Sequence, residues 1–214
     1  MVPKIITVSR ELGSGGRTIG RKLAAKLNYR YSDKELIHDL QNKFNLTTSG
    51  IEKLKGQKKS WFNDFIQLVA PAPQADMLVE ADSPYIKEFR ADRTTDDIHE
   101  AEVEIIKAIA AEGPCVIAGR SAFFILQDTP GKVDVFVTAS KEHRIERVMA
   151  KQGLSREQSI EVIDRVDKQR DNYVQRYTGK TRYDARNYNL VINVDDIDED
   201  DAVDVILDYI AKMK

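Results

Sequence analysis

Three glycines within four residues form the most distinctive segment of this sequence. They are Gly13, Gly15 and Gly16, in residues 11–18 (ELGSGGRT), which follow the β-branched run 5–8 (IITV). In such a turn backbone N–H groups can converge on a small anion, and a helix that begins there adds its partial positive charge at the same point. A glycine turn between a strand and a helix therefore indicates phosphate binding.

Two side chains beside these glycines suit the handling of a nucleoside triphosphate. Thr18 stands where a hydroxyl can reach a magnesium ion, and Arg17 where a cation can reach terminal phosphate oxygens. We therefore predict ATP and Mg²⁺ as ligands, with Thr18 on the metal and Arg17 also in catalysis. The predicted phosphate-binding residues are Gly13, Ser14, Gly15, Gly16, Arg17 and Thr18.

The turn departs from the usual phosphate-loop pattern, G-x-x-x-x-G-K-[ST], at two positions. Glu11 takes the place of the first glycine, and Arg17 takes the place of the lysine. The alternative interpretation is a tight glycine turn that carries an exposed arginine.

The spacing of apolar residues predicts the elements that position this turn. Ile19, Leu23 and Leu27 recur every four residues, which predicts an amphipathic helix directly after the glycines. Strands separated by helices imply parallel pairing through right-handed crossovers, and hence a doubly wound α/β sheet. Further strands are predicted at 29–31, 115–118, 133–137 and 190–194, and further helices at 35–43, 98–109, 140–149, 155–176 and 202–213.

Length and composition predict one domain with an insertion. The chain has 214 residues, of which 42% are hydrophobic, enough for a full core near the upper size of a single domain. Residues 44–95 are less regular and contain Pro71, Pro73, Pro84 and the lone Trp61. We predict that they form a small insertion with short helices.

Charge and apolar patterning exclude several classes of partner. The formal net charge is -2, so the chain as a whole carries no field that would attract nucleic acid or anionic lipid. It has no apolar run long enough to span a bilayer, and residues 1–10 lack the apolar core of a secretory signal. With Cys115 as the single cysteine, no internal disulfide or cysteine metal cluster is possible. We expect a cytoplasmic protein that binds small-molecule nucleotides, with its oligomeric state open.

Four segments of the chain resemble landmarks of the cytidylate kinase-like family of bacterial P-loop kinases. They are residues 9–17 (SRELGSGGR), 31–37 (YSDKELI), 118–120 (AGR), and 166–170 (VDKQR) leading to 177–180 (YTGK). Their order matches along nearly the whole chain. The resemblance implies a five-stranded parallel core of the nucleoside-monophosphate-kinase type in a single domain, 1–214. It also implies an acceptor-binding insertion at 33–96 and a mobile, arginine-bearing lid at 151–186.

The resemblance also implies roles for charged residues outside the glycine turn. Asp33 resembles the acceptor-side aspartate, although after the predicted cap Ser32 it can equally serve a helix dipole. Arg120 directly follows the strand 115–118, where its guanidinium suits an acceptor phosphate; a surface salt bridge is the alternative. Arg147 is predicted on the donor side, where an arginine can stack on the donor base.

Basic residues of the predicted lid form a second group. Several positive charges there can surround the transferred group as water is excluded. We predict Arg170 and Arg176 as its catalytic members, because Tyr173 replaces a family arginine and Arg176 stands further along the helix. The group comprises Arg170, Arg176, Lys180, Arg182 and Arg186.

These residues favour an ATP-dependent phosphotransferase that moves the γ-phosphoryl group to a nucleoside monophosphate or a similar small acceptor. Cytidylate kinase itself carries an aspartate on each side of the G-R pair, where this chain has Ala118 and Ser121, so CMP is not favoured as the acceptor. Two alternatives stay open. One is a non-catalytic nucleotide-binding regulatory module, which Arg17 in place of lysine favours, and the other is a small-molecule kinase with a non-nucleotide acceptor.

Overall fold

The computed structural model describes residues 3–33 and 95–213. The chain divides into two compact units, one of residues 1–34 with 107–214 and the other of residues 35–106. The predicted helix at 35–43 and most of the predicted insertion at 33–96 lie outside the described residues. Apart from the first part of α6, which belongs to the second unit, the features discussed below belong to the first unit.

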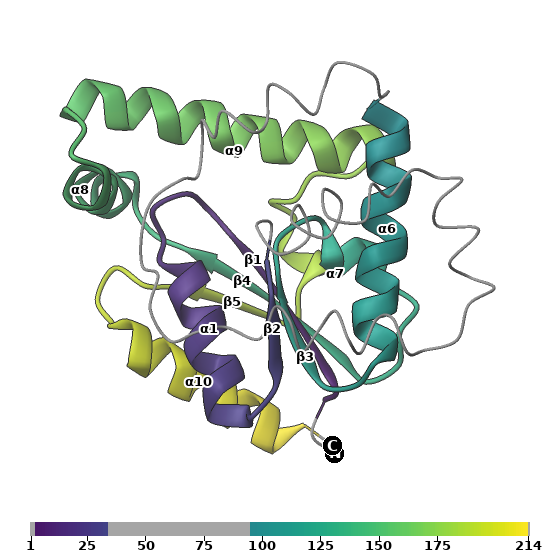
Figure 1. Cartoon of the computed structure of the whole chain (residues 1–214). Coiled ribbons are helices and arrows are strands. Elements are labelled where there is room, and N and C mark those ends of the chain that lie inside the picture. The colour runs from purple at the N-terminus through teal and green to yellow at the C-terminus, as the bar shows by residue number, and fades with distance from the viewer. Residues whose placement is uncertain (1–2, 34–94, 214) are drawn as a thin grey trace. The chain divides into compact units, whose positions relative to one another are not determined.

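A parallel sheet forms the centre of this unit, in the strand order β2-β3-β1-β4-β5 (Figure 1). β1 is central, with Val8 opposite Ala118 of β3 and Val135 of β4. The predicted five-stranded parallel fold is confirmed, and the glycine turn after β1 lies between the ends of two neighbouring strands. The strands are β1 (Ile5–Arg10), β2 (Arg30–Ser32), β3 (Cys115–Ala118), β4 (Lys132–Thr138) and β5 (Leu190–Asn193).

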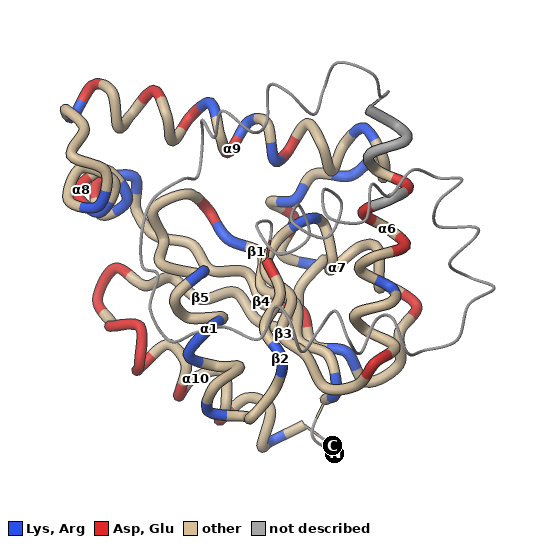
Figure 2. The backbone as a smooth tube through the Cα atoms, in the orientation of Figure 1, with Lys and Arg blue, Asp and Glu red and all other residues tan. Residues whose placement is uncertain are grey.

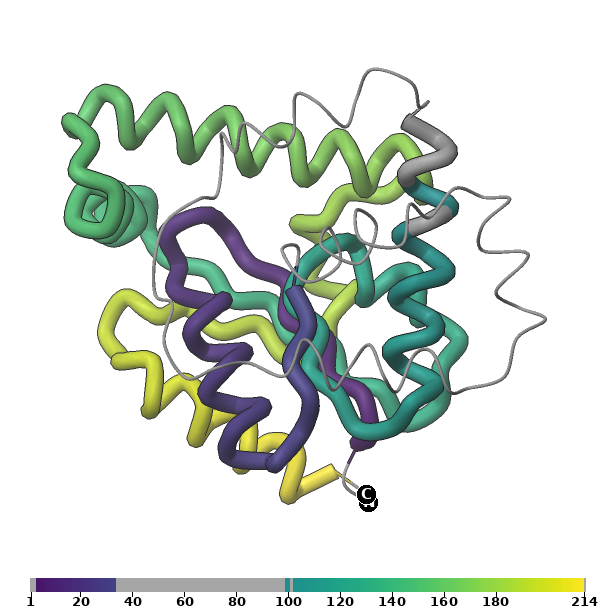
Figure 3. Tube along the Cα trace, viewed as in Figure 1, coloured from purple at the N-terminus to yellow at the C-terminus, as the bar shows by residue number. Residues whose placement is uncertain are grey.

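The described helices are α1 (Gly16–Leu27), α6 (Thr95–Ala111), α7 (Ala122–Ile125), α8 (Lys141–Gln152), α9 (Arg156–Thr178), the 3₁₀ helix η1 (Ala185–Asn187) and α10 (Glu199–Lys212). Within residues 3–33 and 95–213, none of them is long and apolar enough to cross a membrane. The chain trace shows α1 and α10 side by side on one face of the sheet (Figure 3).

Local sequence signals account for the boundaries of α8 and α9 and for the start of α10. Ser140 caps α8, and Ser155 with Gln158 forms a capping box at the start of α9. Gly153 and Gly179 end these two helices in the left-handed conformation. α10 begins at Glu199, three residues before the predicted start at 202, because the Asp198 side chain accepts hydrogen bonds from the N–H groups of residues 200 and 201. α7 was not predicted, since its four residues carry no helical periodicity.

Charged residues of both signs lie along α9, and acidic residues gather before and within the start of α10 (Figure 2). Asp198 caps α10, and Asp195 accepts a hydrogen bond from the Ser140 N–H at 2.8 Å. Within the acidic stretch 195–201, Asp198 therefore serves as a helix cap. Such acidic residues also complement the positive end of the helix dipole.

The core beneath α1 and α10 is apolar, whereas the opposite face of the sheet includes a polar network. Ile6 and Val8 of β1 pack against Leu23 of α1 and Ile206 of α10. On the other face, burial raises the pKa of Asp134 even though its carboxylate accepts hydrogen bonds from Lys132 and Thr7. These donors offset part of the cost of burying the carboxylate.

Candidate functional site

The glycine turn joins β1 to α1 and is shaped by two left-handed glycines. Gly13 has φ +85° and Gly15 has φ +76°, conformations that L side chains rarely adopt. A Cβ at Gly13 would also lie 2.6 Å from the backbone oxygen of Arg144, so α8 packs directly on the turn. Glu11 is not among the described residues with positive φ, which explains why this position does not require glycine.

The start of α1 is an electropositive point. The first N–H groups of a helix have no partner within the helix, and in α1 the first turn contains no acidic residue. Ser14 is buried, and its Oγ donates to the Glu11 carbonyl at 3.0 Å, which stabilises the bend of the turn. Thr18 lies half-buried in the same first helical turn. The arrangement suits an anion held by backbone N–H groups.

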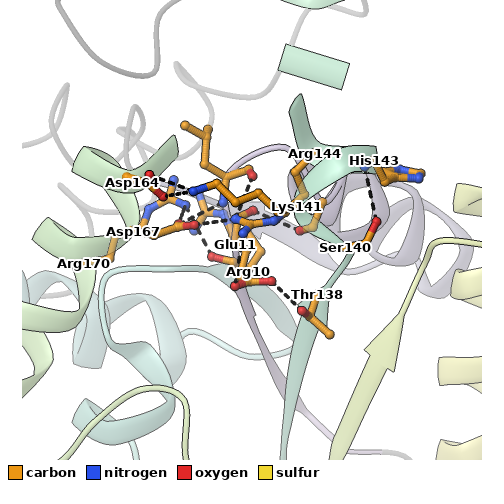
Figure 4. A network of polar contacts seen from close by, with 12 residues as sticks. Arg10, Glu11, Thr138, Ser140, Lys141, His143, Arg144, Asp164, Asp167 and Arg170 are labelled. Carbon is orange, nitrogen blue, oxygen red and sulfur yellow. Dashed lines mark hydrogen bonds and ion pairs between the residues drawn. The ribbon is translucent and has the colours of Figure 1, made fainter. Parts of the chain in front are cut away.

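A buried carboxylate, Asp167 of α9, ties the turn to the helices beside it (Figure 4). Its Oδ1 accepts from the Leu12 N–H at 3.0 Å, and its Oδ2 pairs with Arg144 Nη1 at 2.6 Å. Arg144 in turn lies 3.7 Å from Glu11 Oε1, and Glu11 also accepts a hydrogen bond from Thr138. The turn is thus held by α8, α9 and β4 together.

Two arginines converge on the last residue of β1. Arg170 Nη1 donates to the Arg10 carbonyl at 3.3 Å, and Arg182 donates to the same oxygen. Arg182 is 5% exposed, and burial lowers the pKa of its guanidinium, with the positive charge of Arg10 adding to the effect. Arg182 stood in the basic group predicted from the sequence but was not selected as one of its catalytic members.

Arg176 occupies a different environment from Arg170. It is exposed near the end of α9, with its Cζ 5.5 Å from the ring centroid of Tyr177. The structure therefore brings Arg170 to the end of β1, where Arg182 joins it. The catalytic roles of Arg170 and Arg176 stay predictions.

Arg17 and Asp33 form an ion pair beside the glycine turn. Arg17 Nε donates to Asp33 Oδ2 at 3.0 Å, and Arg21 Nη2 lies 3.7 Å from the same oxygen. Asp33 is buried and directly follows β2. The structure thus joins a predicted phosphate-binding residue to a predicted acceptor-binding residue.

The turn after β3 is strained. Gly119, Arg120 and Ser121 have consecutive positive φ values of +82°, +52° and +53°. Non-glycine residues are uncommon in this region, and such strain clusters at functional sites. The half-buried Arg120 thus lies at the carboxyl edge of the sheet, one strand from the glycine turn.

Arg147 reaches the glycine turn from α8. Its Nη2 pairs with Glu199 at the start of α10, and a Cβ at Gly15 would lie 3.3 Å from its Cζ. The residue therefore lies next to the predicted donor phosphates, while its stacking on a base stays a prediction.

The single cysteine has the environment expected of a core residue. Cys115 is buried in β3, and burial raises the pKa of its thiol to about 11. The thiolate is the nucleophilic form, so this residue is inert at neutral pH. Within the described part of the chain, no group of three or more His, Cys, Asp or Glu side chains could hold a metal ion.

Comparisons with known proteins show the family and the fold that this chain shares. The model of the cytidylate kinase-like family matches residues 5–196. A cytidylate kinase of Methanocorpusculum labreanum is 26% identical over 190 residues, which cover 88% of this chain and 85% of that protein. An uncharacterized protein from Eubacterium ventriosum has a similar structure, with a TM-score of 0.67, 25% identity and coverage of 98% and 99%. Shikimate kinase from Bacteroides thetaiotaomicron shares the fold, with a TM-score of 0.55, 14% identity and coverage of 97% and 98%.

Proposed function

Because the chain belongs to the cytidylate kinase-like family, we propose that it transfers the γ-phosphoryl group of ATP to a small acceptor, a nucleoside monophosphate or a compound of similar size. The observation that carries this proposal is the glycine turn at the start of α1, whose N–H groups suit the donor phosphates. Phosphoryl transfer depends on positioning and charge stabilisation, so it requires no side-chain nucleophile.

The proposed donor site uses the glycine turn and Thr18. A magnesium ion is commonly held by one or two protein groups together with substrate phosphates and water, so a single hydroxyl at this position fits it. The ion would supply neutralisation of phosphate charge. In this proposal Arg17 in the turn and Arg170 of α9 also neutralise the phosphate charge.

The proposed acceptor lies beyond the ends of β2 and β3, near Asp33 and Arg120. A carboxylate and a guanidinium can bind hydroxyl and oxyanion groups of one small molecule. Ala118 and Ser121 provide no carboxylate beside Arg120, so we propose an acceptor other than CMP. Because no carboxylate stands beside Arg120, a small acceptor that is not a nucleotide is the second candidate.

A panel assay tests this proposal. Purified protein with Mg²⁺ and ATP would be incubated with each nucleoside monophosphate and with a set of small hydroxy acids and alcohols, and ADP formation measured. We expect ADP formation that depends on one acceptor class. Tight ATP binding without acceptor-dependent turnover would instead identify a nucleotide-binding module. Absence of ATP binding would overturn the proposal.

Replacing Arg170 with alanine should distinguish an enzyme from a passive binder. If Arg170 stabilises charge in the transition state, the variant should lose kcat by about 10²-fold while its affinity for ATP changes little. Lys168→Ala is the matched control, because it removes one cation from an exposed position of the same helix. Equal kinetics in the two variants would exclude a transition-state role for Arg170.

A further inference from the structure

The side chain of Arg10 is a buried cation at the carboxyl end of the central strand. It is 9% exposed. Its stem lies against the start of α1, because a Cβ added to Gly16 would come within 2.5 Å of the Arg10 Cβ. Its guanidinium lies against the turn after β3, where a Cβ added to Gly119 would overlap Nη1. The Arg10 side chain therefore lies between the glycine turn and the strained turn that carries Arg120.

The charge of Arg10 has no carboxylate partner among the described residues, and its Nε is buried without a hydrogen bond. Arg144, the neighbouring buried arginine, is instead paired with Asp167 at 2.6 Å. A buried guanidinium that lacks such a partner is costly to the folded protein. A function in binding an anionic ligand would explain why the protein keeps this destabilising residue.

A second buried polar atom lies at the same edge of the sheet. Ser32 Oγ at the end of β2 is buried and has no hydrogen-bond partner within the described ranges. Ser32 pairs in register with Ile117 of β3, two residues before Gly119. Donors thus remain unused at the ends of β1 and β2, on the side of the proposed acceptor.

We propose that Arg10 binds the anionic group of the phosphoryl acceptor, either a phosphate monoester or a carboxylate. This inference rests on the proposed function and adds to it a named recognition residue. A planar guanidinium fork binds either oxyanion through two hydrogen bonds. The contact with Gly119 places this fork on the acceptor side, whereas donor phosphates have the N–H groups of residues 13–18.

The test uses the full-length protein with its donor site filled by a non-hydrolysable ATP analogue. Inorganic phosphate and acetate are titrated separately, and the Arg10 Nε–H resonance is followed by nuclear magnetic resonance after assignment with Arg10→Lys. We expect a saturable shift with at least one anion. Stronger binding of phosphate indicates a phosphate monoester as the acceptor, and stronger binding of acetate indicates a carboxylate. Saturation by neither anion would overturn the inference.

Arg10→Met separates binding from folding, because methionine keeps the apolar stem and removes the charge. We expect anion affinity to fall about 10- to 100-fold, as for loss of a bidentate charged contact, while analogue affinity stays within about twofold. The thermal midpoint should not fall, since an unpaired buried cation is removed. A lower midpoint with unchanged anion affinity would make Arg10 a structural residue.

Arg30→Met is the matched control. Arg30 lies at the opposite end of β2, where its Nη2 donates to the Ile109 carbonyl at 3.0 Å. We expect this variant to lower the thermal midpoint and leave anion binding unchanged. If the wild-type protein does not bind the ATP analogue, the proposed function itself is wrong. If the wild-type protein binds the analogue and shows acceptor-dependent turnover, but Arg10→Met leaves anion affinity unchanged, only the inference about Arg10 is wrong.

Discussion

Replacing Arg17 with alanine is expected to lower kcat/KM for phosphoryl transfer about 10²- to 10³-fold. A cation directed at transferred charge in a site that excludes water contributes about 3 to 4 kcal/mol to the transition state. Arg17→Lys should recover most of this loss, because lysine is the residue of the usual phosphate-loop pattern. Steady-state kinetics with the acceptor identified by the panel assay measure both variants.

The ion pair with Asp33 gives Arg17 a second possible role, which a double-mutant cycle can separate. Asp33 Oδ2 lies 3.0 Å from Arg17 Nε. If Arg17 acts only by orienting Asp33, then Arg17→Ala, Asp33→Asn and the double variant should lose similar amounts of kcat/KM. If Arg17 also contacts phosphate, the double variant should lose more than Asp33→Asn alone. We expect the second result.

Arg21→Ala is the control for charge on the same helix. Arg21 is 3.7 Å from Asp33 Oδ2, and its side chain is 41% exposed. Because exposed ion pairs contribute little, we expect a change in kcat/KM of no more than about fivefold. If Arg17→Ala leaves ATP affinity and turnover unchanged, the alternative interpretation of residues 13–18, a tight turn with an exposed arginine, is correct.

The turn and its supporting elements were predictable because their signals are contiguous in the sequence. Gly13 and Gly15 mark the left-handed positions, and the apolar repeat from Ile19 marks the helix that follows. Ser155 and Gln158 likewise marked the start of α9, and the capping box is present. Local chemistry determines each of these features, so one segment is enough to recognise it.

Contacts between distant segments were not predictable in the same way. The bond from the Leu12 N–H to Asp167 joins residues 155 positions apart, and a single sequence contains no signal for it. Similarly, the sequence places Arg176 further along the same helix as Arg170, but it is Arg182, after Gly179, that returns to the Arg10 carbonyl. Tertiary packing determines which arginines meet, and periodicity does not encode that choice.

Arg10 illustrates the same limit for buried charge. In the sequence it is a polar residue at the end of a β-branched strand, a position where an arginine is most often solvated. Only the approach of Gly16 and Gly119 to its side chain reveals that it is buried. Those glycines then gain a second explanation, because a side chain at either would collide with Arg10.

Asp167→Asn is expected to lower the free energy of unfolding by about 3 to 5 kcal/mol, the cost of breaking a buried ion pair. The amide would leave Arg144 buried with only its longer contact to Glu11 and would weaken the bond to the Leu12 N–H. Because Leu12 precedes Gly13, ATP affinity should fall as well. Urea unfolding followed by circular dichroism measures the stability, and calorimetric titration measures ATP binding.

Asp164→Asn provides the matched control, one turn earlier on the same helix. Asp164 Oδ2 accepts from Lys141 Nζ at 2.7 Å, but its side chain is 60% exposed. An exposed pair of this kind contributes about 0 to 1 kcal/mol, so the control should unfold nearly as the wild type does. Similar unfolding curves for both variants would show that Asp167 does not anchor the turn. A large loss in Asp167→Asn alone, accompanied by weaker ATP binding, would establish that packing of α9 holds the phosphate turn in its binding conformation.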